Sequence, residues 1–473
     1  MKTECTPTDL RSGRLGTREI RAGFDGGKLS SDGGAILLRM TEQRTRLLRR
    51  FAGCFRDYRS ESWVEHSVEE LVAQRVMGLV LGYEDLNDHD RLRFDTLLAV
   101  AVGKREPESR KKGDQDGPAL ASSSTLNRLE LASDDHENDR YKKIAFDPAA
   151  ADQLLFEHFA ESVERREGEA PKEIVLDLDT TDLPLHGHQE GRFFHGYYRC
   201  YCYLPLYVFC GDYLLAALLQ TSDKDGARNA QSVCARLVAQ VRERWPGARV
   251  VVRGDSGFCR NELMSWCEEN EVDYVFGLAK NSRVVSQIED ELEIAKELHE
   301  ETGLPERVYA EFDYRTIDSW DRSRRVVAKA EHLEKGSNPR FVVTSFPRET
   351  VEAHVLYEHG YCQRGEMENR IKEQQLDLFA TRASGATLRA NQLRLYFSAI
   401  AYALIQALRD LGLAETSLQR AQANTIRLKL FKIAARVRVT ARRVWLQLSS
   451  ACPFAELFAE VHANLSACPV IVM

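Results

Sequence analysis

The sequence predicts an α/β protein in which a mixed β-sheet, covered by helices, is flanked by helical regions at both ends. In residues 1–150 the apolar residues recur at the spacing of helices. For example, Ser67 and Glu70 are expected to form a capping box ahead of an apolar stripe. After Pro171, short apolar runs bounded by turn residues alternate with amphipathic stretches, which indicates strands and helices of one layered sheet. Beyond Ser384 the spacing is again helical, and we expect almost entirely helix there.

Five apolar runs form the expected sheet. They lie at residues 174–176, 203–209, 213–219, 249–252 and 274–278, with helices expected over 227–244 and 261–270. Three strands, helix, strand, helix and strand is the order of a mixed sheet with helices on its faces. A further strand-rich stretch, residues 308–346, looks inserted before the next long helix.

Length and composition indicate a soluble protein of several structural units. The 473 residues exceed what one hydrophobic core usually supports, and 43% hydrophobic with 29% charged residues is ordinary for a globular chain. No apolar run is long enough to span a membrane and the N-terminus is polar, so we expect a cytoplasmic protein with no membrane partner. The cysteines are single apart from Cys200 and Cys202, which favours reduced thiols over a zinc or disulfide framework.

Basic residues are unevenly distributed although the net charge is −7. Residues 416–455 contain no acid but carry many cations, among them Arg442 and Arg443. A solvated helix face is the usual outcome for such a run, yet exposed helices normally intersperse acids, so we favour contact with nucleic-acid phosphates. Smaller candidates are Arg128, which follows a serine-rich helix start, and an N-terminal cluster of Arg44, Arg46, Arg49 and Arg50.

Two aspartates end strands of the expected sheet. Asp179 follows the first apolar run, and Asp255 follows the fourth. Open α/β sheets bind ligands beyond the carboxyl ends of their strands, so these acids are candidates for one site. Asp177 shares a strand face with Asp179, and either could be the first member of that site.

A third acid comes from residues 361–375. At about 100° per residue, this segment forms a helix with a polar stripe beside an apolar one, so the helix can pack on the sheet and present Glu368 at its edge. The alternative is an ordinary surface helix in which Glu368 pairs with Lys372. The polar stripe contains Tyr361, Arg364, Glu368, Lys372 and Gln375.

Three carboxylates from distant parts of the chain suit phosphoryl transfer. Mg²⁺ and Mn²⁺ take oxygen ligands and bind few protein carboxylates while they coordinate phosphate. Two such ions clamp the attacking and leaving oxygens of an in-line displacement. Asp179, Asp255 and Glu368 would supply that clamp, and Arg364 and Lys372 would neutralise phosphates of a DNA strand.

Several stretches together resemble a known family. Residues 176–181, residues 253–258 and the pattern Tyr361-x2-Arg364-x3-Glu368 look like the three signature regions of cut-and-paste bacterial DDE transposases. More narrowly, the chain resembles insertion-sequence transposases of DDE domain group 1. That resemblance also rests on residues 29–34, 82–88, 123–130, 187–189 and 365–373.

The resemblance implies an RNase H-like mixed-sheet core, interrupted before its catalytic Glu by a β-rich insertion. It implies that Asp179, Asp255 and Glu368 are the catalytic residues and bind two Mg²⁺ (or Mn²⁺) ions. It also implies that Tyr361 and Arg364 contact the DNA of the element's end.

Four further residues are expected to contact DNA. Relatives carry Lys seven residues after the Glu, where this chain has Gln375, and Lys372 is the expected substitute. Arg253, which opens the second signature region, is a further candidate. Trp320 in the insertion is the candidate for stacking a flipped base, and a Trp buried in the insertion core is the alternative.

The expected organisation has five segments. They are a mainly helical DNA-recognition domain (1–150), a core in two parts (171–285 and 351–400), a β-rich insertion between them (286–350) and a basic helical C-terminal region (401–473). We expect a transposase that cleaves DNA at the terminal repeats of its insertion sequence and transfers the 3′-OH ends to target DNA. A homodimer on DNA, in the bacterial cytoplasm and at the nucleoid, is the expected working form.

Two other functions stay open from the sequence. A haloacid-dehalogenase-like phosphatase has the motif DxDxT after a strand, which residues 177–181 fit with Asp177 as nucleophile. Its late acidic motif is not matched, because Cys259 and Arg260 stand where a second acid is expected. A metal-dependent DNA nuclease that cuts without joining would share the three carboxylates.

Overall fold

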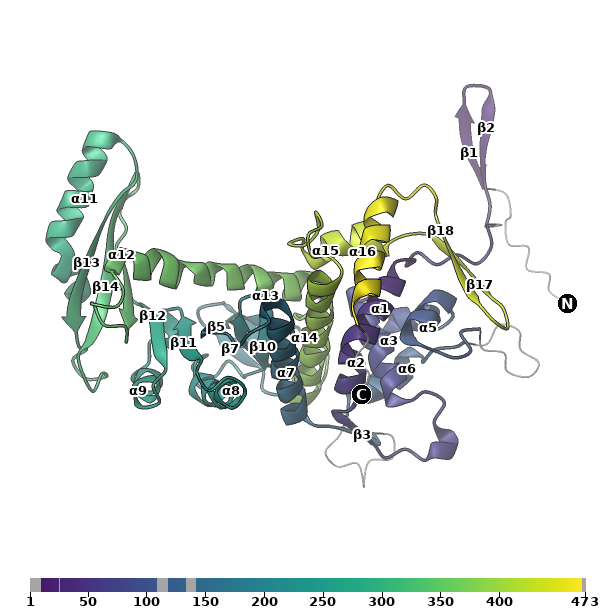
Figure 1. Ribbon diagram of the computed structural model, residues 1–473, viewed down its shortest axis with the longest axis horizontal. Helices are drawn as coiled ribbons and strands as arrows, with labels where there is room; N and C mark the ends of the chain where they lie inside the picture. Colours follow the sequence, from purple (N-terminus) through teal and green to yellow (C-terminus); the bar gives the residue numbers. More distant parts are fainter. Residues whose placement is uncertain (1–9, 25, 109–117, 133–141, 470–473) are drawn as a thin grey trace.

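The molecule is elongated, with helices at one end and a large β-sheet towards the other (Figure 1). The computed structural model describes residues 10–24, 26–108, 118–132 and 142–469. Within these residues, no helix has both the length and the apolar character needed to cross a membrane.

Within the described residues the large sheet has nine strands, and five of them form its core part in the order β10-β9-β5-β11-β12. β5 is parallel to β11, and β11 to β12, whereas β9 is antiparallel to both β5 and β10. β5, the first of these strands in the sequence, thus lies at the centre of the five. Only β9, the second in the sequence, runs antiparallel to the others, which is the arrangement of an RNase H-like core. The predicted fold class is confirmed. The bounds are β5 Glu173–Thr180, β9 Leu206–Cys210, β10 Tyr213–Leu218, β11 Arg249–Gly254 and β12 Asp273–Leu278.

Side chains of β5 alternate between the two faces of the sheet. Ile174, Leu176 and Leu178 point into a core shared with α8 (Ala230–Arg244) and α9 (Asn261–Glu269). The intervening residues of β5 therefore face the other side, where α13 contacts β5 (Figure 1).

The insertion extends this sheet. β16 pairs with β12 and β14 pairs with β16, both antiparallel, so backbone hydrogen bonds run without a break from the core into the insertion. α11 packs on β13 and β14. The bounds are α11 Glu289–Thr302, β13 Glu306–Tyr314, β14 Arg324–Leu333, β15 Gly336–Ser337 and β16 Arg340–Thr344.

Trp320 lies inside the insertion, and the expectation that it stacks a flipped base is wrong. Only 4% of Trp320 is exposed. Its ring packs edge-on against Tyr314, with centroids 5.7 Å apart, and its backbone N–H donates to the Thr316 hydroxyl. The alternative reading, a core tryptophan, is the one that the structure supports.

One long helix joins the two ends of the molecule. α14 (Leu388–Leu411) has 24 residues and is buried along most of its length. It packs on α1 and α3 of the N-terminal helices on one side and on α7 and β10 on the other. A single apolar core therefore continues from the N-terminal helices to the sheet. The N-terminal elements are α1 Ala35–Thr45, α2 Leu47–Ala52, β3 Phe55–Asp57, α3 Val68–Val80, α4 His89–Leu92, α5 Thr96–Val102, α6 Ser123–Glu130, β4 Ile144–Phe146 and α7 Pro148–Glu167.

The sequence predicts an almost entirely helical C-terminal region, and this prediction is wrong. The basic stretch contains an antiparallel hairpin of β17 (Ala435–Val439) and β18 (Val444–Leu448), ahead of α16 (Ala455–Ala467). The cause is visible in Ala-Arg-Val-Arg-Val, where apolar residues alternate with Arg at a period of two. A second hairpin, β1 (Leu10–Leu15) with β2 (Arg18–Ala22), lies near the N-terminus and was not predicted.

Candidate active site

Two aspartates near the carboxyl end of β5 lie on one face of the sheet, and their surroundings differ. Asp177 is 4% exposed and pairs across the sheet with Arg253 of β11. Asp179 lies where β5 ends, and its Oδ1 accepts a hydrogen bond from the Thr180 N–H at 2.9 Å.

Arg253 holds Asp177 in a buried ion pair. Its Nε donates to Asp177 Oδ1 at 2.6 Å, its Nη2 to Oδ2 at 2.7 Å, and its Nη1 to the Gly360 carbonyl at 2.7 Å. Arg253 is 8% exposed, so the expectation that it contacts DNA is wrong. The reason is the parallel register, which sets Arg253 directly beside Asp177. Asp179, at the end of the strand, is the β5 aspartate that lies outside this pair.

Asp255 follows β11 and caps the next turn. Its Oδ1 accepts a hydrogen bond from the Gly257 N–H at 2.8 Å. Since β5 and β11 are parallel neighbours, Asp179 and Asp255 lie at the same edge of the sheet. Gly277 on β12 permits the chain to close over this edge, because a Cβ there would stand 2.6 Å from the Tyr361 hydroxyl.

The third segment reaches this edge through an irregular helix. A π-helical turn, Leu356–Tyr361, and a 3-10 turn, Cys362–Arg364, lead into α13 (Gly365–Asp377). π-helical turns inside helices occur frequently at functional sites. On α13, Met367 is buried against the core while Glu368 remains exposed towards the strand ends.

Arg364 lies among all three acids. Its Nη1 is 3.7 Å from Asp179 Oδ2, and its Nη2 donates to Glu368 Oε1 at 3.2 Å. Burial lowers the pKa of Arg364, but the charges of Asp179, Tyr361, Asp255 and Glu368 raise it above the usual value. Within the described residues, Arg364 Nη1 is buried and donates no hydrogen bond.

Asp179 is the acid most affected by this environment. Burial raises its pKa to about 6; Arg364 acts in the opposite direction, and the nearby Asp255 and Glu368 add to the rise. Like charges in a partly desolvated site disfavour each other's ionised form. The edge of the sheet therefore concentrates negative charge that a cation would relieve.

The acids surround Arg364 and do not converge on one point. Among the residues that the structure describes, no three His, Cys, Asp or Glu side chains form a group that could hold a metal ion. The donor set nevertheless fits Mg²⁺ or Mn²⁺, since it consists of carboxylate oxygens. Glu368, whose side chain is 47% exposed, has room to turn towards the two aspartates.

The remaining predicted contact residues lie in different places. Lys372 is exposed on α13, and Gln375 on the same helix is half-buried. Arg128 lies on the exposed face of α6, while Arg442 and Arg443 lie at the β17–β18 turn. The structure thus groups Tyr361 and Arg364 with the acids and leaves the residues of α6 and of the hairpin elsewhere.

Tyr198 was missed by sequence reasoning. Its hydroxyl donates to the Thr180 carbonyl at 3.5 Å. Burial, followed by the charges of Asp182 and Asp179, raises its pKa to about 12. Tyr198 lies in the turn between β7 and β8 of a small sheet, in which β8 pairs with both β6 and β7. The aromatic run 193–203 was the available signal in the sequence. The bounds are β6 Leu183–Pro184, β7 Phe193–His195 and β8 Cys200–Tyr203.

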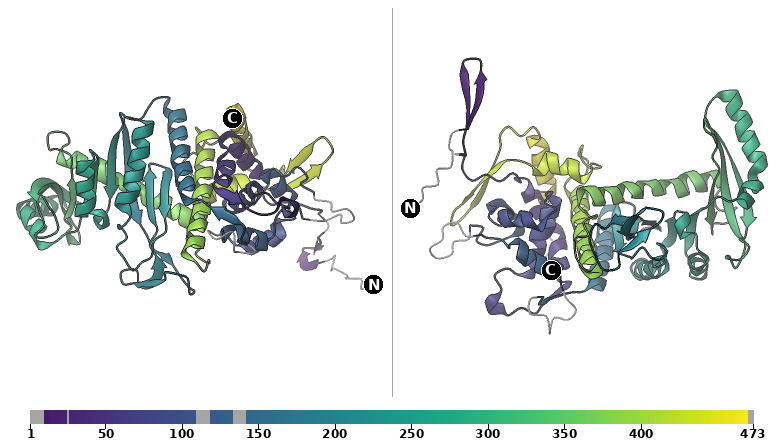
Figure 2. Two further views of the ribbon diagram at one scale, coloured as in Figure 1. Left: turned by 90° about the horizontal axis from the view of Figure 1, so that it is seen from below. Right: turned by 180° about the vertical axis from the view of Figure 1, so that it is seen from behind.

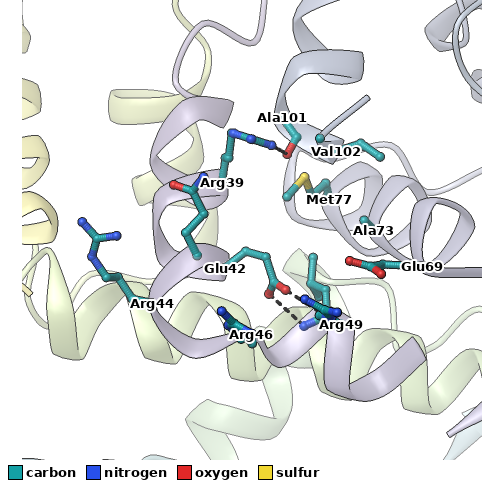
Figure 3. A pocket seen from close by; sticks show the side chains of 13 residues that line it. Arg39, Glu42, Arg44, Arg46, Arg49, Glu69, Ala73, Met77, Ala101 and Val102 are labelled. Carbon is teal, nitrogen blue, oxygen red and sulfur yellow. Dashed lines mark hydrogen bonds between the residues drawn. The ribbon is translucent and has the colours of Figure 1, made fainter. Parts of the chain in front are cut away.

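A separate cavity of about 460 Å³ lies among the N-terminal helices (Figure 3). Glu42 in its wall accepts hydrogen bonds from the Leu48 and Arg49 N–H groups. Most of the N-terminal basic cluster lines this cavity, whereas Arg50 pairs with acids of α7. The arginines of the wall are Arg39, Arg44, Arg46 and Arg49.

The RNase H-like core and the acids gathered at its edge define a protein of the DDE class. The sequence matches the family model described as Transposase DDE domain group 1 over residues 13–470, and the chain belongs to that family. Among solved structures, a piggyBac transposase synaptic complex with hairpin DNA is similar, with a TM-score of 0.36 and 12% identity, covering 85% of this chain and 80% of that one. No curated protein matches the sequence.

Replacing Asp177 by Asn should destabilise the protein, because it leaves Arg253 buried without its counter-charge. Removing one partner of a buried ion pair costs about 3–5 kcal/mol. We expect the free energy of unfolding, measured by urea denaturation, to fall by that amount. Asp57→Asn, which removes a more exposed pair with Arg59, is the control and should cost less than about 1 kcal/mol. Equal losses in the two variants would contradict a structural role for Asp177.

Asp179→Asn should instead stabilise the protein at neutral pH. The folded pKa of about 6 lies above the ordinary value of 3.8, so the ionised carboxylate opposes folding once the pH exceeds the folded pKa. The advantage of Asn, on the order of 1–3 kcal/mol, should be complete above pH 7 and shrink as the pH falls towards 4. Thermal unfolding in EDTA across this range measures it. A difference that does not change with pH would count against the assigned environment of Asp179.

Proposed function

We propose that this protein is a DNA transposase that cleaves the ends of its insertion sequence and joins them to target DNA. One observation carries the proposal. Acids from β5, from the end of β11 and from α13 meet around one arginine at the edge of an RNase H-like sheet. Membership of the transposase DDE domain group 1 family supports the same reading.

Asp179, Asp255 and Glu368 would hold the divalent metal ions. All three supply carboxylate oxygens, and the pKa of Asp179 is raised chiefly by burial, with the nearby charges of Asp255 and Glu368 adding to the rise. When bound, Mg²⁺ or Mn²⁺ would stabilise the charge that develops on phosphate oxygens during displacement.

Arg364 and Tyr361 would position the phosphate that is cut. Arg364 Nη1 is buried without a hydrogen bond within the described residues, and a phosphate oxygen would accept one from it. Its Nη2 releases Glu368 when the guanidinium turns towards that phosphate, and Glu368 then becomes available beside Asp179. Lys372, exposed on the same helix, would contact a flanking phosphate.

The reaction would proceed in two displacements. Water first hydrolyses a phosphodiester at the element's end, and the freed 3′-OH then attacks target DNA at the same site. Two ends must be held together for joining, so we propose a homodimer on DNA, acting in the cytoplasm and at the nucleoid. A nuclease that cuts without joining would use the same acids.

The phosphatase alternative is disfavoured by the surroundings of Asp177. A nucleophilic carboxylate needs an approach path for its substrate and an oxygen that is free to attack. Both oxygens of Asp177 accept hydrogen bonds from Arg253, and the residue is 4% exposed.

The test is Mg²⁺- or Mn²⁺-dependent cleavage of DNA that carries the element's own terminal repeats. Asp179→Asn, Asp255→Asn and Glu368→Gln should each lower the cleavage rate by about a thousandfold or more, since each removes several kcal/mol of transition-state stabilisation. Binding of the same DNA should persist. Glu366→Gln, which removes an exposed acid of the same helix, is the control and should cleave normally.

Strand-transfer products distinguish a transposase from a nuclease. Joined products in the wild type, lost with cleavage in the three variants, support the proposal. Full activity of Glu368→Gln would refute the role of the three carboxylates. Cleavage without any joining would refute the proposal that the protein is a transposase.

A further inference from the structure

The N-terminal hairpin of β1 and β2 projects from the body of the molecule. Every residue of β1 and β2 is exposed. Figures 1 and 2 show the hairpin standing clear of the N-terminal helices. An isolated two-stranded hairpin is marginally stable in water, so such a ribbon is expected to gain order by binding something.

The charge of this hairpin points to an anionic partner. Arg11 and Arg21 stand directly opposite each other across the strands, and Glu19 forms ion pairs with both of them. Glu19 is the one acid among the residues of the two strands, which carry four arginines. Arg14 and Arg18 add two further exposed positive charges beside it.

The C-terminal hairpin is a second basic ribbon at the same end of the molecule (Figures 1 and 2). Arg436 and Arg438 are exposed on one face of β17, and Trp445 of β18 pairs across from Arg438 on that face. Arg442 and Arg443 occupy the turn at its tip. No acid occurs in residues 435–448, so this ribbon is purely basic.

The two ribbons share one root, although they come from opposite ends of the chain. Downstream of β2, Ser30 forms an isolated antiparallel bridge with Ala435, the first residue of β17. The Ser30 N–H donates to the Ala435 carbonyl at 2.9 Å, and the Ala435 N–H returns a bond to Ser30 at 2.8 Å. The Gly33 N–H donates to the Ile433 carbonyl at 2.8 Å.

Buried polar contacts and glycines fix this root. Asp32, which is 2% exposed, forms an ion pair with Lys432 at 2.6 Å and accepts a hydrogen bond from the Tyr83 hydroxyl at 2.6 Å. A Cβ on Gly33 would stand 2.6 Å from the Ile433 carbonyl, and one on Gly34 would stand 1.8 Å from the Leu430 carbonyl. The segment Leu29–Gly34 is therefore the joint that brings the two ribbons to one place.

We propose that β1–β2 and β17–β18 form a two-pronged clamp that grips duplex DNA away from the active site. A two-stranded ribbon fits the major groove of B-DNA, which is about 12 Å wide. Arginines at both ribbons would contact phosphates, and the Ser30–Ala435 bridge brings the chain segments that lead to the two ribbons together. The inference rests on the proposed function and adds to it a surface that binds DNA.

The salt dependence of binding tests the clamp. The probe is a fluorescently labelled 40-base-pair duplex of mixed sequence, and its affinity is measured between 50 and 200 mM salt with the full chain. Each phosphate contact contributes about 0.9 to the slope of log K against log salt. Arg14→Gln with Arg18→Gln should lower this slope by about two, and so should Arg436→Gln with Arg438→Gln.

The control is Lys172→Gln with Lys335→Gln, two exposed cations in the part of the chain that forms the large sheet. It should keep the wild-type slope. Melting temperatures should be unchanged in all three double variants, because the substituted side chains are exposed. Amide hydrogen exchange supplies a second readout: residues 10–22 should exchange rapidly alone and be protected when the duplex is added.

The outcomes separate this inference from the proposed function. If the wild type binds and cleaves DNA but both ribbon variants keep its slope and residues 10–22 stay unprotected, the clamp is wrong and the transposase reading stands. If the ribbon variants lose slope but the wild type never cleaves its terminal repeats, the clamp stands and the catalytic proposal fails. If the wild type binds no duplex, both fail.

Discussion

Arg253 is the side chain on which the arrangement of this site depends. It lies on β11 two residues before Asp255 and is paired with Asp177, which lies on β5 two residues before Asp179. Its remaining donor reaches the Gly360 carbonyl, next to Tyr361. One buried guanidinium therefore links all three segments that carry the acids. Because an unpaired buried charge is costly, each link keeps the other two in place.

Arg364 is the positive charge that lies among the three acids, and a metal ion could replace it in that role. Burial raises the pKa of Asp179, and the charges of Asp255 and Glu368 at the same sheet edge raise it further. Arg364 partly neutralises them, yet one of its nitrogens remains buried without a hydrogen bond within the described chain. A metal ion on the acids and a phosphate on the arginine would satisfy both groups together. Metal binding and substrate binding would then both depend on one rearrangement of Arg364 and Glu368.

The sequence was informative where one local pattern decides the outcome. Apolar runs that end in Asp179 and Asp255 located the strand ends, and helical spacing placed Glu368 on a helix beside an apolar stripe. Prediction from the sequence failed where strand register or tertiary packing determines the position of a residue. Nothing in one sequence shows that Arg253 and Asp177 are cross-strand neighbours, so Arg253 was taken for a DNA contact. The density of arginines near the C-terminus does not distinguish a helix from a strand, whereas the alternation of Ala-Arg-Val-Arg-Val indicates the strand that the structure contains.

The central claim is that Asp179, Asp255 and Glu368 form one metal site in which Arg364 gives way to the ion and the DNA. The most direct measurement is a crystal structure of the full chain with Mn²⁺ and end DNA, with anomalous scattering recorded at the manganese edge. The account predicts anomalous peaks bridging the three carboxylates, with Arg364 turned onto a phosphate. Manganese at any other group of side chains, or Arg364 still between Asp179 and Glu368 beside bound DNA, would contradict it.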